Sequence, residues 1–315
     1  MTNTQNARLH WPAIPYLEWR ETSAALHLYL QIVGKYRLAH TPWINHSWHA
    51  TFYPTPRGLT TSLTADGDGV EIQFDFVDHR VRGVCGNGST GDFALEPMSV
   101  AEFHGRFIEL VEHLGGTAIF HGRPNELPTN TRFVDDSEQR PYDRDAVARF
   151  HRATQSISHV FQDFRTGFRG KVSPVHLFWG SFDLAVTRFS GRPAPLHPGG
   201  FPNLPDAVTQ EAYSHEVSSA GFWAGGGPVE EAAFYSYAYP SPDGFADATV
   251  LPDAAYFDKD FGEFILTYDA VRSSDDPEAT LLSFLESTYE AAASLGRWDR
   301  DLDCECGLKG KPLST

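Results

Sequence analysis

The sequence predicts an α+β protein made of two similar halves, each with a helix, an antiparallel sheet and a second helix. Two observations lead to this fold class. In four segments, apolar residues recur three and four positions apart, which is the spacing of an amphipathic helix. Between these segments, apolar and polar residues alternate, which is the spacing of a strand with one face in water.

The four helices are marked by their ends as well as by their periodicity. Gly34 is read as the stop of the first helix, and Ser99 with Glu102 forms a capping box that opens the second. Asp276 is followed by a proline, which is tolerated at the first position of a helix. The predicted helices cover residues 18–33, 99–114, 143–168 and 276–295.

The strands follow from the alternation of apolar and polar residues. Val70, Ile72 and Phe74 alternate with polar residues, and the Asp78-His79 pair allows a tight hairpin to the next strand. Strands are predicted at 46–53, 59–63, 70–76 and 81–84 in the first half, and at 176–189, 213–223, 233–239 and 261–268 in the second.

The chain divides into an N-terminal half (12–122), a linker (123–142), a C-terminal half (143–297) that carries the site, and a polar tail (298–315). Each half places a proline and a His/Trp strand after its first helix, at 42–48 and 174–179, which predicts an internal duplication. The proline-rich stretch 191–205 excludes helix and central strand, because proline lacks the N–H that both require. A long ordered loop of this kind is often functional.

Composition narrows the class of protein. The 315 residues are 41% hydrophobic, enough for a large core, and the formal net charge is −16. This charge disfavours nucleic acids and anionic membranes, and it favours a neutral or cationic small molecule as partner. The N-terminus has no signal-peptide pattern, and the three cysteines do not form a disulfide framework. We therefore expect a cytoplasmic protein; the oligomeric state is not predicted.

Three long stretches carry a resemblance to a known family. They begin at Thr41 (TPWINHSWH), Ser173 (SPVHLFWGSFDLAVTRFSGR) and Tyr213 (YSHEVSSAGFW). In these stretches the chain resembles a bacterial family of domains of unknown function, numbered 5996 (DUF5996). The resemblance covers nearly the whole chain. It implies one family-wide unit, and it implies no activity.

The strand predicted at 176–189 contains Asp183 within an apolar run. A buried carboxylate costs several kcal/mol unless it has a partner. One interpretation pairs Asp183 with Arg188 or a backbone N–H group. The other makes Asp183 a ligand contact or an acid/base group.

Two further strands carry polar groups among aromatic ones. His215 and Glu216 are adjacent on the strand 213–223, so their side chains point to opposite faces unless a bulge intervenes. Tyr235, Tyr237 and Tyr239 recur at period two, either as packing residues or as an aromatic platform for a planar or sugar-like ligand.

From these patterns we predict an enzyme that acts on a small polar or aromatic metabolite. A histidine titrates near neutral pH, and a half-buried glutamate can be tuned towards it, so His215 or Glu216 would transfer protons. The predicted catalytic residues are His215, Glu216, His176 and Asp183. The predicted ligand-binding residues are Trp179, Arg188, His197, Trp223, Tyr235, Tyr237, His46 and Trp48.

Two alternatives stay open. One is a non-catalytic binding module for a small molecule or a protein. The other is a metalloenzyme with a carboxylate and the histidines His176 and His215. No nucleotide-binding motif, zinc motif or nucleophile elbow is present, so the sequence leaves the cofactor undetermined and a metal possible. The pair Cys304 and Cys306 is a further, weaker metal candidate.

Overall fold

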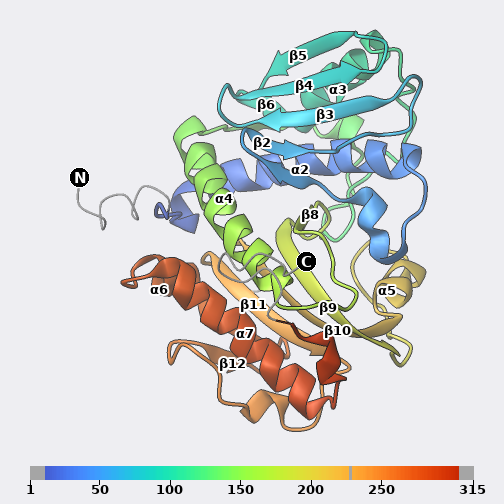
Figure 1. The fold of residues 1–315 in the computed structure, drawn as a ribbon. Coiled ribbons are helices and arrows are strands. Elements are labelled where there is room, and N and C mark those ends of the chain that lie inside the picture. The colour runs from blue at the N-terminus through green and yellow to red at the C-terminus, as the bar shows by residue number, and fades with distance from the viewer. Residues whose placement is uncertain (1–10, 227–228, 305–315) are drawn as a thin grey trace, which may run out of the picture.

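A computed structural model describes residues 11–226 and 229–304 of the chain. It contains two separate antiparallel sheets, one in each half, with helices packed against both, and α2 (Tyr16–His40) runs across the molecule between them (Figure 1). The α+β class predicted from the sequence is therefore confirmed. In the described part of the chain, no helix has the length and apolar composition needed to cross a bilayer.

The N-terminal sheet has five strands in the order β1-β2-β3-β4-β5. Its strands are β1 (Tyr53–Thr55), β2 (Gly58–Thr60), β3 (Val70–Asp75), β4 (Arg80–Cys85) and β5 (Thr90–Ala94). The predicted hairpin after β3 is confirmed, since Asp75 pairs with Arg80 across it. One face packs on α3 (Val100–His113), where Phe74 stacks on Phe103 with ring centroids 6.1 Å apart. Tyr29 of α2 stacks on the same Phe103 at 4.3 Å.

The C-terminal sheet has six strands in the order β12-β13-β11-β10-β9-β8. These are β8 (His176–Phe178), β9 (Asp183–Pro193), β10 (His215–Trp223), β11 (Ala233–Tyr239), β12 (Tyr256–Asp258) and β13 (Glu263–Thr267). Helices α4 (Arg144–Thr166) and α7 (Pro277–Leu295) pack against one face of this sheet. Short elements complete the half and its linker: α5 (Asp206–Ala212), α6 (Tyr268–Arg272), β6 (Met98–Ser99) and β7 (Gln139–Arg140).

Three of the four predicted helix starts are confirmed by their caps, and the first helix begins at Tyr16 without a side-chain cap. The side chains of Ser99, Asp143 and Asp276 each accept a hydrogen bond from a backbone N–H of the first turn. The predicted end of the first helix is wrong, because α2 continues through Gly34 to His40. The Trp179 ring lies where a side chain at Gly34 would be, so this glycine serves a close contact and not a helix stop.

Two predicted strands are also wrong in part. Residues 45–50 form the 3₁₀ helix η1 (Asn45–Ala50), in which His46 and Ser47 have positive φ, and extended pairing starts only at Phe52. The strand predicted at 176–189 is interrupted by a hairpin turn between β8 and β9, at which Phe182 has φ 58°. Sequence alternation alone did not reveal this turn, because the turn residues are themselves aromatic and small.

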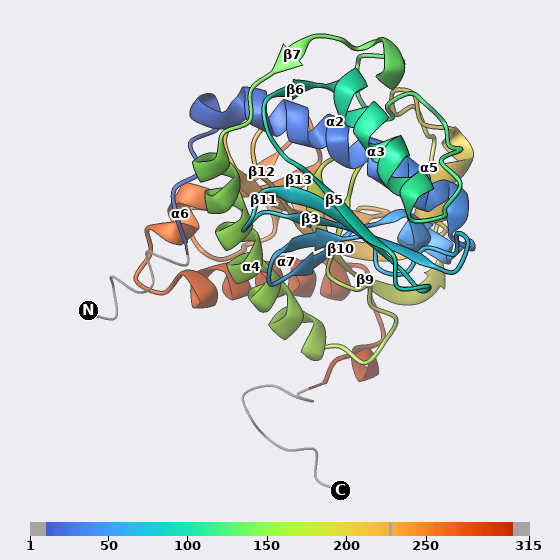
Figure 2. The same ribbon diagram turned by 90° about the horizontal axis from the view of Figure 1, so that it is seen from above.

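The two halves are joined through backbone and side chains. Phe52 and Leu177 exchange two backbone hydrogen bonds of 3.0 and 2.8 Å, which connect the edge of one half to the other. The view from above shows α2 and α3 lying over the sheets, with α4 and α7 on another side (Figure 2). The two sheets differ in strand number, and the internal duplication stays a prediction, as do the domain boundaries.

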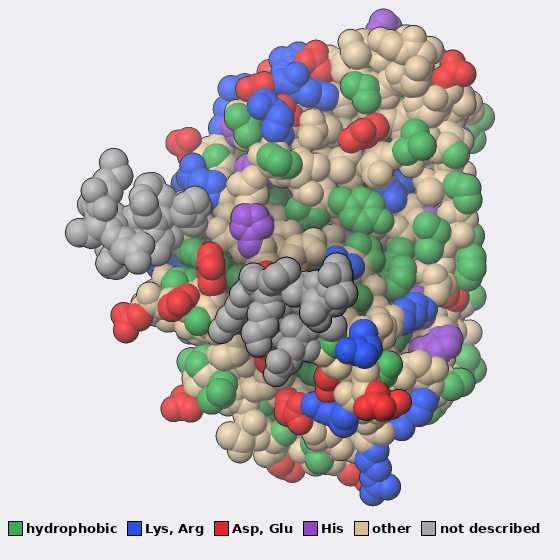
Figure 3. Space-filling view, viewed as in Figure 1, with side chains coloured by type: hydrophobic (Ala, Val, Ile, Leu, Met, Phe, Trp, Pro, Cys, Tyr) green, Lys and Arg blue, Asp and Glu red, His purple; other side chains and the backbone are tan. Residues whose placement is uncertain are grey.

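Charged side chains do not gather by sign on the face shown in Figure 3, where Lys and Arg lie among Asp and Glu. Neighbouring opposite charges in the N-terminal sheet form ion pairs, for example Arg57 with Asp78 and Arg80 with Asp92. Cys85 and Cys304 form no disulfide in the described structure, and the Cys304 thiol donates to the Thr166 carbonyl oxygen at 3.4 Å. Cys306 lies outside the described residues.

Candidate functional site

A cavity of about 910 Å³ lies between the two halves of the molecule. Helix α2, η1 and residues 121–126 of the linker line one side, and the C-terminal sheet lines the other. Residues 201–213, including α5, close a further side. The volume lies within the range typical of sites for small organic ligands.

The floor of the cavity is one face of the C-terminal sheet. Because side chains alternate along a strand, every second residue of β9 and β10 faces the cavity. The register places Asp183 opposite Trp223, and Thr187 opposite Ser219. Ser219 is in turn opposite Tyr237 on β11. Polar groups from three neighbouring strands therefore meet on one surface.

Asp183 is the buried centre of this floor, with 5% of its surface exposed. Its carboxylate accepts hydrogen bonds from the hydroxyls of Ser181 and Tyr235. Tyr235 reaches it from two strands away by lying over Gly221, where any Cβ would meet the ring at 2.3 Å. Burial raises the pKa of Asp183, and the two hydrogen bonds only partly oppose the rise.

Two more carboxyl groups share the cavity with Asp183. Burial, followed by the charge of Asp183, raises the pKa of Glu126 to about 7. The same two causes raise the pKa of Glu263 to about 8. Glu263 Oε2 is buried and has no hydrogen-bond partner in the described structure. These carboxyls are therefore acids whose proton is held near neutral pH.

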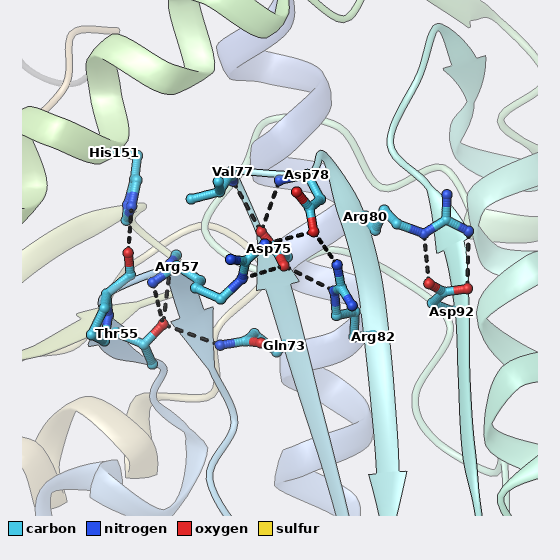
Figure 4. Close-up of polar contacts among 12 residues, drawn as sticks. Thr55, Arg57, Gln73, Asp75, Val77, Asp78, Arg80, Arg82, Asp92 and His151 are labelled. Atoms are coloured by element: carbon cyan, nitrogen blue, oxygen red, sulfur yellow. Dashed lines mark hydrogen bonds and ion pairs between the residues drawn. The ribbon is translucent and has the colours of Figure 1, made fainter.

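A buried acid elsewhere in the same chain behaves in the opposite way. Asp75 in β3 is fully buried, and it accepts ion pairs from Arg57 at 2.7 Å and Arg82 at 2.8 Å and hydrogen bonds from two backbone N–H groups (Figure 4). Burial alone would raise the pKa of Asp75, but these partners outweigh it and lower the pKa. Asp75 is a paired structural acid, whereas Glu126 and Glu263 lack an ion pair in the described residues.

A row of polar side chains on α2 leads to the opposite wall of the cavity, which Lys35, the last of the row, lines. His27 donates to the carbonyl oxygens of Trp179 and Gly180, at 3.0 and 2.9 Å. One turn on, the Gln31 amide exchanges two 2.8 Å hydrogen bonds with the backbone of Asn125. The next turn carries Lys35, which donates to the Asn125 side chain. This row fixes both the linker and the 179–182 turn against the helix.

The mouth of the cavity is apolar. Trp43, Leu38 and Phe201 line the cavity and are 66%, 42% and 45% exposed. Exposed apolar groups at the rim of a hollow commonly mark a binding site. Backbone strain gathers here as well, since four of the eight described non-glycine residues with positive φ line the cavity: His46, Ser47, Glu126 and Asn203. Such strain clusters at active sites and ligand clamps.

The structure brings together seven of the twelve residues predicted from the sequence. They line the cavity as side chains from β9, β10, β11, η1 and the 179–182 turn: Asp183, Trp179, Trp223, Tyr235, Tyr237, His46 and Trp48. The Pro/Gly loop also contributes, through residues 201–205. Tyr235 and Ser181, and not Arg188, are the partners of Asp183.

The other five residues do not line the cavity. Arg188 lies on the opposite face of the sheet, where its guanidinium is 3.6 Å from the Phe164 ring centroid and pairs with Glu286. His176 is fully buried, and its Nδ1 donates to the Pro174 carbonyl at 2.7 Å. His197 stacks on Tyr213 at 4.6 Å, outside the cavity lining.

His215 and Glu216 are separated from each other by the geometry of β10. A register irregularity lies between His215 and Val217, but the two side chains keep different partners. His215 Nδ1 is 3.1 Å from the Ser214 hydroxyl, and Glu216 pairs with Arg192 at 2.6 Å near the surface. Strand β10 does line the cavity, through Val217, Ser219 and Trp223, whereas His215 and Glu216 at its start do not.

Lys35, Glu126 and Glu263 were not singled out from the sequence. The spacing of His27, Gln31 and Lys35 at four residues is a polar row on a mostly apolar helix, and this signal was available. Glu126 belongs to a proline-rich segment that was read as a linker, and nothing in the pattern shows that it is enclosed. In the described residues, no group of three or more His, Cys, Asp or Glu side chains could hold a metal ion.

The fold and the site define an α+β protein with an aromatic-walled, acid-lined cavity between its two sheets. The sequence model described as "Family of unknown function (DUF5996)" matches residues 11–304, nearly the whole chain, and the protein belongs to this family. No curated protein and no solved structure matches the chain.

Proposed function

We propose that the protein is an enzyme that acts on a small polar or aromatic molecule in this cavity. Glu126, Asp183 and Glu263 would handle protons, and Trp179 and Trp223 would enclose the molecule. The observation that carries the proposal is the meeting of three carboxyl groups of raised pKa, Asp183 buried and the two glutamates partly buried, on one cavity of about 910 Å³. Perturbed acids in a concave apolar site are typical of active sites.

The raised pKa values of the cavity acids and their lack of ion-pair partners among the described residues support proton transfer. A general acid or base works best when its pKa is near the working pH, and Glu126, with a pKa of about 7, meets this condition. Purely structural burial would pair such a group, as the arginines pair Asp75. Glu263 Oε2, which is buried and has no hydrogen-bond partner in the described structure, is a further uncompensated acid atom beside the cavity.

The proposal moves proton transfer away from His215 and Glu216, the residues suggested by the sequence. Neither lines the cavity, and the Glu216 carboxylate is already bound by Arg192. His46 and Trp48 remain as ligand contacts on the η1 side. We also infer a cytoplasmic location, which suits cysteines that form no disulfide in the described structure. A nucleic-acid partner is disfavoured by the formal net charge of −16.

The test is a comparison of turnover among matched variants. Purified protein is incubated with a small-molecule extract of the cells that express it, and the mixture is followed by mass spectrometry. We expect one compound to be consumed by the unmodified protein and by Glu216→Gln, and consumption to fall at least about 100-fold in Asp183→Asn. Circular dichroism checks that each variant is folded.

The other results are equally informative. Retention of a compound without conversion, lost in Trp223→Ala, would establish a non-catalytic binding module. Loss of turnover in His215→Asn and Glu216→Gln, with full turnover in Glu126→Gln and Asp183→Asn, would overturn the residue roles proposed above.

A further inference from the structure

We propose that Lys35 is a nucleophilic amine that forms a Schiff base with the carbonyl group of a small aldehyde or ketone in the cavity. The inference rests on the proposed function, since it uses the same cavity, and it names the class of substrate. Lysine amines act in this way when they are neutral, enclosed and close to an acid.

The environment of Lys35 is unusual for a lysine. The residue is 3% exposed and lines the cavity. No carboxylate oxygen of a described residue lies within ion-pair distance of its amine. Its neighbours are instead the Asn125 side chain, which accepts a hydrogen bond, and the Trp179 ring, whose centroid is 5.2 Å from Nζ. A buried lysine without a counter-ion is costly, so its retention at a cavity wall indicates a use for the amine.

The amine is held in place by its surroundings. Gln31, one turn earlier on α2, clamps the backbone of Asn125 with two hydrogen bonds, so the acceptor of the amine is fixed. Gly34 admits the Trp179 ring, which would be 2.4 Å from a Cβ at this position. Precise placement of the nucleophile is a requirement for covalent catalysis.

The ionisation of the two neighbouring groups suits the reaction. Burial lowers the pKa of Lys35 to about 8, against a small opposing effect of Glu126. About a tenth of the amines are then neutral at pH 7, whereas an ordinary lysine is almost wholly charged. With its pKa raised to about 7, Glu126 is about half protonated at the same pH and can both donate and accept a proton.

The step balances without an oxidant, a reductant or a cofactor. The lone pair of Lys35 Nζ attacks the carbonyl carbon, the C=O π electrons move to oxygen, and a proton passes from nitrogen to that oxygen. A proton from Glu126 then lets the hydroxyl leave as water while the C=N bond forms. The amine and the carbonyl compound give the Schiff base and one water, and Glu126 recovers its proton from the nitrogen.

The test is reductive labelling with a simple probe. The protein is treated with benzaldehyde and sodium cyanoborohydride at pH 7, and labelled lysines are identified by peptide mapping. The chain has only five lysines, at 35, 171, 259, 309 and 311, so each can be followed separately. Since Lys259 is exposed, it is the internal reference.

We expect Lys35 to be labelled at least about tenfold faster than Lys259, because a larger fraction of its amine is neutral. Lys35→Arg keeps the charge and must abolish the label at this position while leaving the label at Lys259 unchanged. Glu126→Gln should slow labelling of Lys35 severalfold and leave Lys259 unaffected, a selectivity that a merely structural role would not give.

Labelling of Lys35 no faster than of Lys259 would overturn the inference. Because Asp183→Asn turnover is measured separately, this result would leave the proposed enzyme standing if turnover still depends on Asp183. Conversely, fast labelling of Lys35 with no compound consumed by the unmodified protein would support the reactive amine and refute the proposed acid-base enzyme.

Discussion

At the scale of single residues, partners decide the state of a buried acid. Asp75 and Asp183 are both almost fully enclosed, but the first is bound by two arginines and the second by two hydroxyls. The pKa of Asp75 is therefore lowered, and the pKa of Asp183 is raised. The cavity acids are kept without full compensation, as expected where a ligand or a reaction supplies the missing partner.

Glu126→Gln should change stability in a pH-dependent way. The carboxyl has an ordinary pKa of 4.5 and a pKa of about 7 in the folded protein. Because the pKa is raised, the folded protein binds the Glu126 proton more tightly than the unfolded chain does. The contribution of this bound proton to the free energy of unfolding is therefore complete below pH 4.5 and is lost as pH rises through 7. Relative to the unmodified protein, the glutamine variant should gain up to about 3 kcal/mol between these values.

Urea unfolding at pH 5, 7 and 8.5 measures this difference. Glu216→Gln serves as the control, because Glu216 forms a partly exposed ion pair with Arg192. The change in the free energy of unfolding caused by Glu216→Gln should stay within about 1 kcal/mol at all three pH values. A constant offset for Glu126→Gln across the range would contradict the assigned pKa.

Asp75→Asn should have the opposite pH dependence. The pKa of Asp75 is lowered, so the carboxylate stabilises the fold above its unfolded pKa and loses this contribution as pH falls through the folded value. We expect a loss of at least about 2 kcal/mol at pH 7 and a smaller one near pH 3. Thermal melts followed by circular dichroism test the sign, and an equal loss at both pH values would count against the ion-pair assignment.

At the scale of secondary-structure elements, α2 carries the site. Its apolar residues predicted a helix, but its end and its role depend on contacts from distant segments. Gly34 is covered by Trp179, and Lys35 and Gln31 hold the linker. A glycine at a helix end and a glycine under an indole ring look the same in a sequence.

Gly34→Ala and Gly105→Ala form a matched pair that tests this contact. Both glycines are in helices, where alanine is favoured by about 1 kcal/mol. A Cβ at Gly105 meets nothing within 4 Å, so this variant should be stabilised by up to that amount. A Cβ at Gly34 would lie 2.4 Å from Trp179, and overpacking of about 1–3 kcal/mol should make this variant less stable.

Urea denaturation of the two variants under identical conditions gives the comparison. Opposite signs are expected, and Trp fluorescence should change only for Gly34→Ala. A gain in stability for both would show that Trp179 is free to move away from the helix.

Sequence periodicity located the four long helices and most strands, and the candidates Asp183, Trp223 and Tyr235 chosen from these strands line the cavity. It failed at η1 and at the 179–182 turn, where positive φ at His46 and Phe182 breaks an apparent strand. It also missed Glu126 and Glu263, because enclosure by a distant segment leaves no mark on the local pattern. The fold class follows from local sequence patterns, whereas the cavity forms only through contacts between segments that are distant in the sequence.

At the scale of the whole molecule, the cavity belongs to neither half alone. Lys35 and His46 come from the N-terminal half, Glu126 from the linker, and Asp183 and Glu263 from the C-terminal half. The site predicted from the sequence, which lies in the second half with only His46 and Trp48 from the first, would lack the wall that holds Lys35 and Glu126. The linker between the halves lines the cavity, and hydrogen bonds between Gln31 and the backbone of Asn125 hold it against α2.

This arrangement predicts that the chain unfolds in one cooperative transition. Phe52, which is fully buried, bridges to Leu177 through two backbone hydrogen bonds and packs edge-on against Phe74. Phe52→Ala should cost about 3–5 kcal/mol, the usual loss for a large buried ring, and should shift the single transition as a whole. Circular dichroism and Trp fluorescence should report the same midpoint, since both halves carry tryptophans.

Independently stable halves would give a different result. Phe52→Ala would then lower only the transition of the N-terminal half, and the two signals would separate into two midpoints. A calorimetric enthalpy equal to the van't Hoff enthalpy for the unmodified protein would support one unit. Because the cavity needs walls from both halves, loss of cooperativity would also mean that the site can open by separation of the halves.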